Sequence, residues 1–138
     1  MMQRMLGIDY GEARVGLALS DELGIFAHPL ETIEVKKIDP ARRIREIAKR
    51  EKVALLVLGM PRNMNGSYGP AAEKVTAFAE ILRQRTGIEI KFWDERMTSL
   101  AAQRALHDAG RRVKGGRKVI DQVAAQMILQ GYLDSLAM

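Results

Sequence analysis

Apolar residues fall into short, strand-like runs near the start of the chain and into helix-spaced sets further along it. Turn residues separate the early runs, whereas later runs alternate with segments whose apolar residues recur every three or four positions. This pattern predicts the element order β-β-β-α-β-α-β-α-α. Strands are expected at 5–9, 14–20, 25–35 (kinked near Pro29), 53–58 and 88–93; one helix is expected to begin at Asp39-Pro40, and others to cover 71–85, 100–109 and 118–136.

Three strands joined by hairpins, followed by two strands reached through helices, predict an α/β fold. Its centre would be a five-stranded mixed sheet with helices on both faces. The run 53–58 (VALLVL) is apolar at every position, as expected for a strand that is covered on both sides. No repeat or linker divides the chain, so residues 1–138 are expected to form a single domain.

Composition limits the classes of function. The chain contains no cysteine, which excludes disulfides and thiolate metal sites. It has no apolar run of about 18 residues, and Asp9 interrupts the apolar stretch at the N-terminus. Neither a membrane span nor a signal peptide is therefore expected, and the predicted location is the cytoplasm.

The charge balance favours a polyanionic partner. Lys and Arg number 22 against 17 Asp and Glu, which gives a net charge of +5. Basic side chains that neutralise phosphates gain affinity by releasing counterions. One basic, glycine-containing stretch is expected to hold a nucleic-acid backbone; its members are Arg111, Arg112, Lys114, Arg117 and Lys118.

Acidic residues stand where three predicted elements can meet. Asp9 closes the first strand, Asp94-Glu95 closes the last strand, and Asp121 lies in the first turn of the last helix. Carboxyl ends of neighbouring parallel strands share one edge of a sheet, so these acids would gather there if the first, fourth and fifth strands are adjacent. Such hard oxygen ligands suit Mg²⁺ or Mn²⁺, which can activate water for phosphodiester hydrolysis.

Each acid also has a structural interpretation. Asp9 suits a turn, Asp94 can end its strand or cap the backbone that follows, and Asp121 can complement the positive end of a helix. The segment from Asp9 to Gly16 also resembles the Asp-x-Gly hairpin of actin-like and sugar-kinase ATPases. A phosphotransferase or nucleotide-binding module is therefore an alternative, although those ATPases duplicate their fold and this chain shows no second copy.

Further contacts to nucleic acid are expected near the same edge of the sheet. The loop 61–70 follows a strand and contains Asn63, whose amide can bind a phosphate or a base. Arg14 and Arg96 can each contact phosphate or balance the acids in an ion pair.

Four blocks of sequence resemble the YqgF/RuvX family, in the order and spacing of that family. They are GIDYGEARVGLALSD (7–21), LVLGMPRNMNGSYGP (56–70), DERMTSLAA (94–102) and KVIDQVAAQMILQGYL (118–133). The resemblance covers essentially the whole chain. It implies a bacterial cytoplasmic protein with an RNase H-like fold, akin to that of the Holliday junction resolvase RuvC.

The resemblance also implies a role for each acid. Asp9 matches the family's first-strand aspartate and Asp121 matches the aspartate of the last helix. Glu95 is the expected metal-facing member of its pair, with Asp94 in reserve. The three acids Asp9, Glu95 and Asp121 are therefore the expected catalytic and metal-binding residues.

The family is described as a pre-16S rRNA nuclease that acts in ribosome biogenesis, and was earlier labelled a Holliday junction resolvase. The expected function is therefore metal-dependent hydrolysis of structured nucleic acid, with an rRNA precursor as the substrate and association with the ribosome. Cleavage of a DNA junction is the first alternative. A non-catalytic RNA- or ribosome-binding module is the second.

Overall fold

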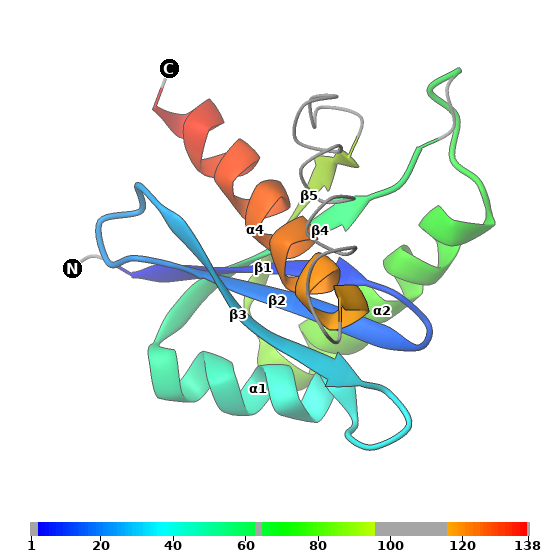
Figure 1. The fold of residues 1–138 in the computed structure, drawn as a ribbon, viewed down its shortest axis with the longest axis horizontal. Helices are drawn as coiled ribbons and strands as arrows, with labels where there is room; N and C mark the ends of the chain where they lie inside the picture. Colours follow the sequence, from blue (N-terminus) through cyan, green and yellow to red (C-terminus); the bar gives the residue numbers. More distant parts are fainter. Residues whose placement is uncertain (1–2, 63–64, 96–115, 138) are drawn as a thin grey trace.

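A computed structural model describes residues 3–62, 65–95 and 116–137. Figure 1 labels the helices and strands within these ranges. The strands are β1 (Arg4–Tyr10), β2 (Arg14–Ser20), β3 (Ala27–Glu34), β4 (Val53–Met60) and β5 (Glu89–Asp94), and the helices are α1 (Pro40–Glu51), α2 (Pro70–Thr86) and α4 (Gly116–Leu136).

The five strands form one mixed sheet in the order β3-β2-β1-β4-β5. β1 pairs antiparallel with β2 and parallel with β4, and β4 pairs parallel with β5. β3 adds an antiparallel edge next to β2. The five-stranded mixed sheet predicted from the sequence is therefore confirmed, and the first, fourth and fifth strands are adjacent as the carboxylate hypothesis requires.

Helices cover both faces of this sheet (Figure 1). The larger core cluster packs α1 and α2 against one face, with side chains such as Ile8, Ile44 and Leu82 fully buried. The smaller cluster packs α4 against the other face through Ala125 and Leu129. The prediction of helices on both faces is confirmed. The central strands require this cover, because their side chains are apolar on both faces of the sheet.

Residues at the start of α1 and at the end of α2 have the capping roles that the sequence predicts. The Asp39 side chain accepts a hydrogen bond from the backbone N–H of Ala41 at 3.1 Å, which caps α1 ahead of its first-turn proline. Gly87 ends α2 with a left-handed φ of 68°, and its N–H bonds the carbonyl of Arg83.

The third strand is shorter than expected, because a turn occupies its first residues. The Asp21 carboxylate accepts a hydrogen bond from the N–H of Ile25 at 2.8 Å, and the Asp21 N–H bonds the carbonyl of Phe26. β3 consequently begins at Ala27 instead of residue 25 and ends at Glu34 instead of residue 35. The predicted kink near Pro29 is present as an irregularity in the pairing with β2.

The other boundaries differ by one or two residues. β4 continues to Met60 because its pairing with β5 extends to Met60 opposite Asp94. α4 begins at Gly116 instead of residue 118, and its first turn is tied to β3 by a hydrogen bond from Thr32 Oγ1 to the carbonyl of Lys118. The expected helix 100–109 and most of the basic stretch lie outside the described residues. No helix among those described is long and apolar enough to cross a membrane.

A close approach between α4 and β2 fixes the position of the last helix. Gly16 lies opposite Asp9 in the β1–β2 pairing, and the backbone of Asp121 sits directly over it. A Cβ atom on Gly16 would overlap the carbonyl oxygen of Asp121. Only glycine leaves room for this contact, which brings the Asp121 end of α4 next to Asp9.

Replacing Gly16 with alanine should therefore push α4 away from the sheet. We expect the free energy of unfolding to fall by about 3 kcal/mol, the upper part of the usual range for overpacking. Denaturant unfolding of the purified variant measures this loss.

Gly24→Ala is the matched control, because Gly24 has a positive φ of 70° but open space around it. It should lose only about 1 kcal/mol from backbone strain. A Gly16→Ala protein as stable as the parent would show that α4 does not depend on this contact.

Candidate active site

Asp9 occupies the centre of the sheet at the end of its first strand. It lies in β1 and shares the face of Gly16, its cross-strand partner, which is the face covered by α4. Directly opposite partners in a sheet project to the same side. Asp9 therefore projects toward α4 and away from the larger core beneath the sheet.

Glu95 reaches the same face from the end of β5. One of its carboxylate oxygens, Oε1, lies 2.6 Å from the position that a Cβ atom on Gly59 would take. The carboxylate therefore lies over β4, the strand between β1 and β5. The absence of a side chain at Gly59 creates the space that Glu95 fills.

Asp94 has a different environment from Glu95. Its Oδ2 lies 3.7 Å from a guanidinium nitrogen of Arg62, the second residue after β4. The guanidinium of Arg62 also lies 4.5 Å from the centre of the Tyr68 ring. Asp94 is paired with Met60, whose side chain belongs to the larger core cluster, whereas Glu95, one residue beyond β5, lies over Gly59 on the face that α4 covers. The two neighbouring acids therefore have different partners.

Asp121 completes the group from the first turns of α4. Its Oδ2 accepts a hydrogen bond from Arg14 Nε at 2.7 Å, and the two side chains are 17% and 31% exposed. Arg14 is the first residue of β2, two positions from Gly16, and projects to the same face of the sheet. The sequence left two roles open for Arg14, and in this structure the guanidinium forms the ion pair.

Charge and burial raise the pKa of two of these acids. The pKa of Asp9 is raised from 3.8 to about 7, first by burial and then by the negative charges of Glu95 and Asp121. The pKa of Glu95 is also raised, by burial and then by Asp94. The structure thus places Glu95 and Asp121 close enough to Asp9 for their negative charges to disfavour ionisation of its carboxyl group.

The three carboxylates are close but not convergent. Within residues 3–62, 65–95 and 116–137, no three His, Asp or Glu side chains are arranged to hold one metal ion. The Asp121 carboxylate is bound to Arg14 in this arrangement. In this arrangement, therefore, one of the three carboxylates, that of Asp121, is engaged in an ion pair and would have to leave it to bind a metal ion.

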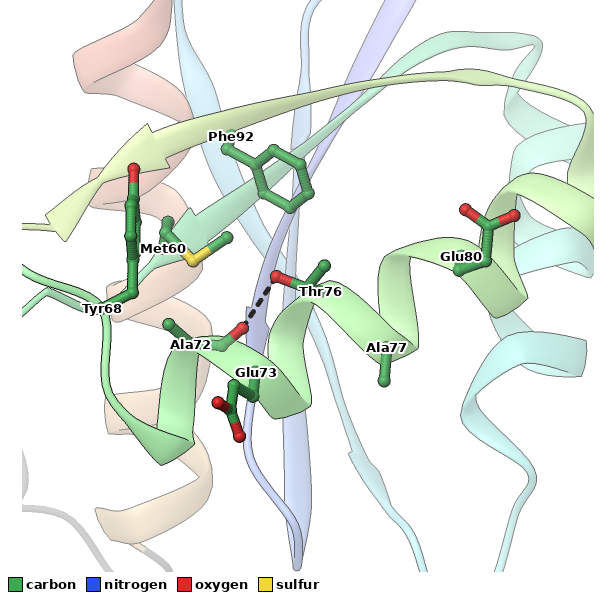
Figure 2. Close-up of a pocket in the computed structure, with 8 residues that line it drawn as sticks. All are labelled: Met60, Tyr68, Ala72, Glu73, Thr76, Ala77, Glu80 and Phe92. Atoms are coloured by element: carbon green, nitrogen blue, oxygen red, sulfur yellow. Dashed lines mark hydrogen bonds between the residues drawn. The ribbon is translucent and has the colours of Figure 1, made fainter.

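A cavity of about 780 Å³ lies elsewhere, beside α2 (Figure 2). Tyr68, Met60 and Phe92 line one side of it, and α2 lines the other with residues that include Glu73 and Thr76. Neither Asp9, Glu95 nor Asp121 is among its lining residues. The candidate active site is therefore separate from this cavity.

The remaining predicted contact residues are only partly described. Lys118 is exposed and pairs with Glu34 of β3 at 2.5 Å. Arg117 lies in α4, where only its backbone is described. The other predicted nucleic-acid contacts lie outside the described residues; they are Asn63, Arg96, Arg111, Arg112 and Lys114.

Sequence reasoning missed one residue near the site, Arg62. It holds Asp94 and packs on Tyr68, so it ties the loop after β4 to the end of β5. The available signal was its place two residues after a parallel strand, at the edge of the sheet where the acids lie.

Comparisons with solved structures show the class of fold. RuvC of Thermus thermophilus, in complex with a Holliday junction substrate, superposes with a TM-score of 0.61 at 15% identity, over 98% of this chain and 96% of RuvC. A second structure of the same RuvC gives 0.55 at 13% identity, with the same coverage. The chain therefore has the RuvC-like variant of the RNase H-like fold, as predicted.

Comparisons of sequence show the family. The model of the RuvX family, described as Holliday junction resolvase, matches residues 3–135, so the chain belongs to this family. A protein of Symbiobacterium thermophilum is 48% identical over 97% of this chain and 94% of its own length. One from Clostridioides difficile is 43% identical over 95% and 94%. Both carry the name "Putative pre-16S rRNA nuclease".

The raised pKa of Asp9 predicts how stability depends on pH. Between about pH 4 and pH 7 the unfolded chain loses this proton while the folded protein keeps it, so stability falls as pH rises and stays lower above pH 7. Asp9→Asn should remove this loss. In chelator at pH 8 the variant should be more stable than the parent by more than about 1 kcal/mol, and at pH 4 nearly equal.

Thermal unfolding from pH 4 to pH 8 tests this expectation. Asp21→Asn is the control, because backbone N–H groups, chiefly that of Ile25, lower the pKa of Asp21. That variant should be less stable than the parent at pH 8. If Asp9→Asn followed the parent at every pH, Asp9 would not be a buried, uncompensated charge.

Proposed function

We propose that this protein is a metal-dependent endonuclease that hydrolyses phosphodiester bonds in an rRNA precursor, near the end of the 16S rRNA. The observation that carries the proposal is the group of Asp9, Glu95 and Asp121, gathered from three elements at one edge of a RuvC-like sheet. The description of the family and the names of the related proteins support nuclease activity, and the names of the related proteins support the choice of RNA.

The donor set suits a divalent cation. All three side chains offer carboxylate oxygens, which Mg²⁺ and Mn²⁺ prefer. Burial and mutual repulsion raise the pKa of Asp9 to about 7, and a bound cation would relieve both effects. Mg²⁺ or Mn²⁺ in this place would supply an activated water and stabilise the negative charge that develops on the phosphate.

The protein's own residues would hold and orient the reacting groups. Asp9 and Glu95 project from the sheet, and their positions depend on the rigid pairing of β1, β4 and β5. Asp121 approaches from α4, whose backbone is fixed against Gly16. Arg62 keeps Asp94 in a separate ion pair, so Asp94 has a positioning role in this proposal.

The choice of RNA over DNA as the substrate rests on the names of related proteins. The related proteins are named as pre-16S rRNA nucleases, whereas the family model and the structural neighbour refer to Holliday junctions. Cleavage of a four-way DNA junction is therefore the second candidate. Action on rRNA would place the protein in the cytoplasm, in contact with the assembling ribosome.

Cleavage of a labelled rRNA precursor in Mn²⁺ and in chelator tests the proposal. The parent should cut only with Mn²⁺. Glu95→Gln should lose more than about 100-fold in rate, because mutating the outer partners of metal ligands already costs about 10- to 100-fold. Asp9→Asn should behave in the same way.

Asp94→Asn is the matched control, because it removes one charge from the adjacent residue. It should keep its rate to within about ten-fold, since Asp94 pairs with Arg62. Equal losses in the Asp94 and Glu95 variants would place both acids in the reaction. A four-way DNA junction in the same assay identifies a resolvase, and binding of both substrates without cleavage would favour the non-catalytic module.

The basic stretch has its own test, which rests on the sequence. Replacing Arg111, Arg112 and Lys114 with glutamine should weaken RNA binding and reduce the slope of log affinity against log salt by about 0.7 for each lost contact to a single strand. An unchanged slope would show that this stretch is not the contact surface. Fluorescence anisotropy in chelator measures the slope without cleavage.

A further inference from the structure

We infer that Arg14 is an internal counter-cation for the metal site. Its guanidinium pairs with Asp121 while the site is metal-free and releases Asp121 when a divalent cation binds. The released guanidinium then contacts the substrate phosphate. The inference rests on the proposed function, because it concerns the same site. It adds a positioning role for Arg14 and an exchange of partners at Asp121.

The first support is the contact itself. Arg14 Nε donates to Asp121 Oδ2 at 2.7 Å, between side chains that are both largely withdrawn from solvent. The neighbour of Arg14 across the sheet is Glu34, which already binds Lys118 at 2.5 Å and Lys37 at 2.8 Å. Arg14 is therefore directed to Asp121, although another carboxylate is nearby.

The second support is the state of the carboxylate group. Glu95 and Asp121 each lie close enough to Asp9 for their charges to act on it, yet within the described part of the chain the three carboxylates do not converge on a point that would hold an ion. The carboxylate of Asp121 forms an ion pair with Arg14. A metal ion would therefore have to compete with the guanidinium for this ligand.

The exchange needs little structural change. The backbone of Asp121 is pressed against Gly16, and the start of α4 is tied to β3 by the bond between Thr32 and the carbonyl of Lys118. The helix can therefore stay in place while the Asp121 side chain rotates. Arg14 would remain beside the cluster, where a guanidinium can bind phosphate through two parallel N–H groups.

The test uses Arg14→Gln, with the apparent affinity for Mn²⁺ measured from the rise in Tm as Mn²⁺ is added. Loss of the competing charge should tighten Mn²⁺ binding by about ten-fold. In chelator the variant should unfold at a lower temperature than the parent, and saturating Mn²⁺ should reduce that difference. An ion pair with only a structural role would cost the same stability with and without Mn²⁺.

Arg4→Gln is a closely matched control. Arg4 pairs with Glu51 at 2.9 Å, and these side chains are 30% and 19% exposed, against 31% and 17% for Arg14 and Asp121. Arg4 begins β1, at the end of the strand away from Asp9. This variant should lose stability equally with and without Mn²⁺, and its affinity for Mn²⁺ should equal that of the parent.

The release of Arg14 is tested by RNA binding. In chelator Arg14 is engaged, so Arg14→Gln should bind RNA as the parent does; with Ca²⁺ as the probe cation, the variant should bind several-fold more weakly than the parent. Arg14→Lys keeps the charge without the guanidinium geometry. It should have an affinity for Mn²⁺ between those of Arg14→Gln and the parent, and it covers the case in which the glutamine variant folds poorly.

The outcomes separate this inference from the proposed function. If Mn²⁺ raises the Tm of the parent but not of Asp9→Asn, and Arg14→Gln binds Mn²⁺ no more tightly than the parent, the exchange is wrong and the metal site stands. If Mn²⁺ does not affect the Tm of the parent, the metal site itself is wrong, and the exchange falls with it.

Discussion

The contact between the start of α4 and Gly16 of β2 is the constraint on which the candidate site depends. It allows the helix backbone to rest on the sheet where a side chain of any size would hold it away. Asp121 is thereby brought from the last helix to the side of Asp9, about one hundred residues earlier in the chain. Gly59 has the same effect for Glu95, so missing side chains create the space in which the carboxylates gather.

The site is electrostatically costly, and the rest of the fold offsets that cost. Burial and neighbouring negative charges raise the pKa of Asp9 and of Glu95, which means that the folded protein is less stable when both are ionised. The larger core cluster beneath the sheet contains most of the fully buried side chains. Burial of this apolar area stabilises a framework that can hold charged groups on its other face.

Ion pairs divide the four acids into two groups. Arg62 binds Asp94 and Arg14 binds Asp121, whereas Asp9 and Glu95 are the two acids whose pKa is raised. The two arginines reach the site from the ends of different strands, and neither was assigned its partner from sequence. This division explains how two adjacent acids, Asp94 and Glu95, come to have different environments.

The amino-acid sequence was enough to predict the order of the elements, the mixed sheet and the edge of the sheet at which the acids lie. These features follow from local patterns: apolar runs, the Asp39 cap, the Gly87 end of α2 and the positions of acids after strands. Hydrophobic periodicity and capping act over a few residues, so they can be read from the chain directly. The family resemblance added the roles of the acids, and the comparisons confirm the family itself.

The contacts between charged groups, in contrast, depend on how the folded chain packs. The ion pair of Arg14 joins residues 107 positions apart, and the start of β3 depends on a turn formed by the Asp21 side chain. Such contacts are set by the twist of the sheet, by the depth to which α4 packs and by competition among neighbouring charges. Since none of these leaves a local pattern in the chain, the sequence offered the four acids and Arg14 as candidates but not their pairing, and it did not single out Arg62.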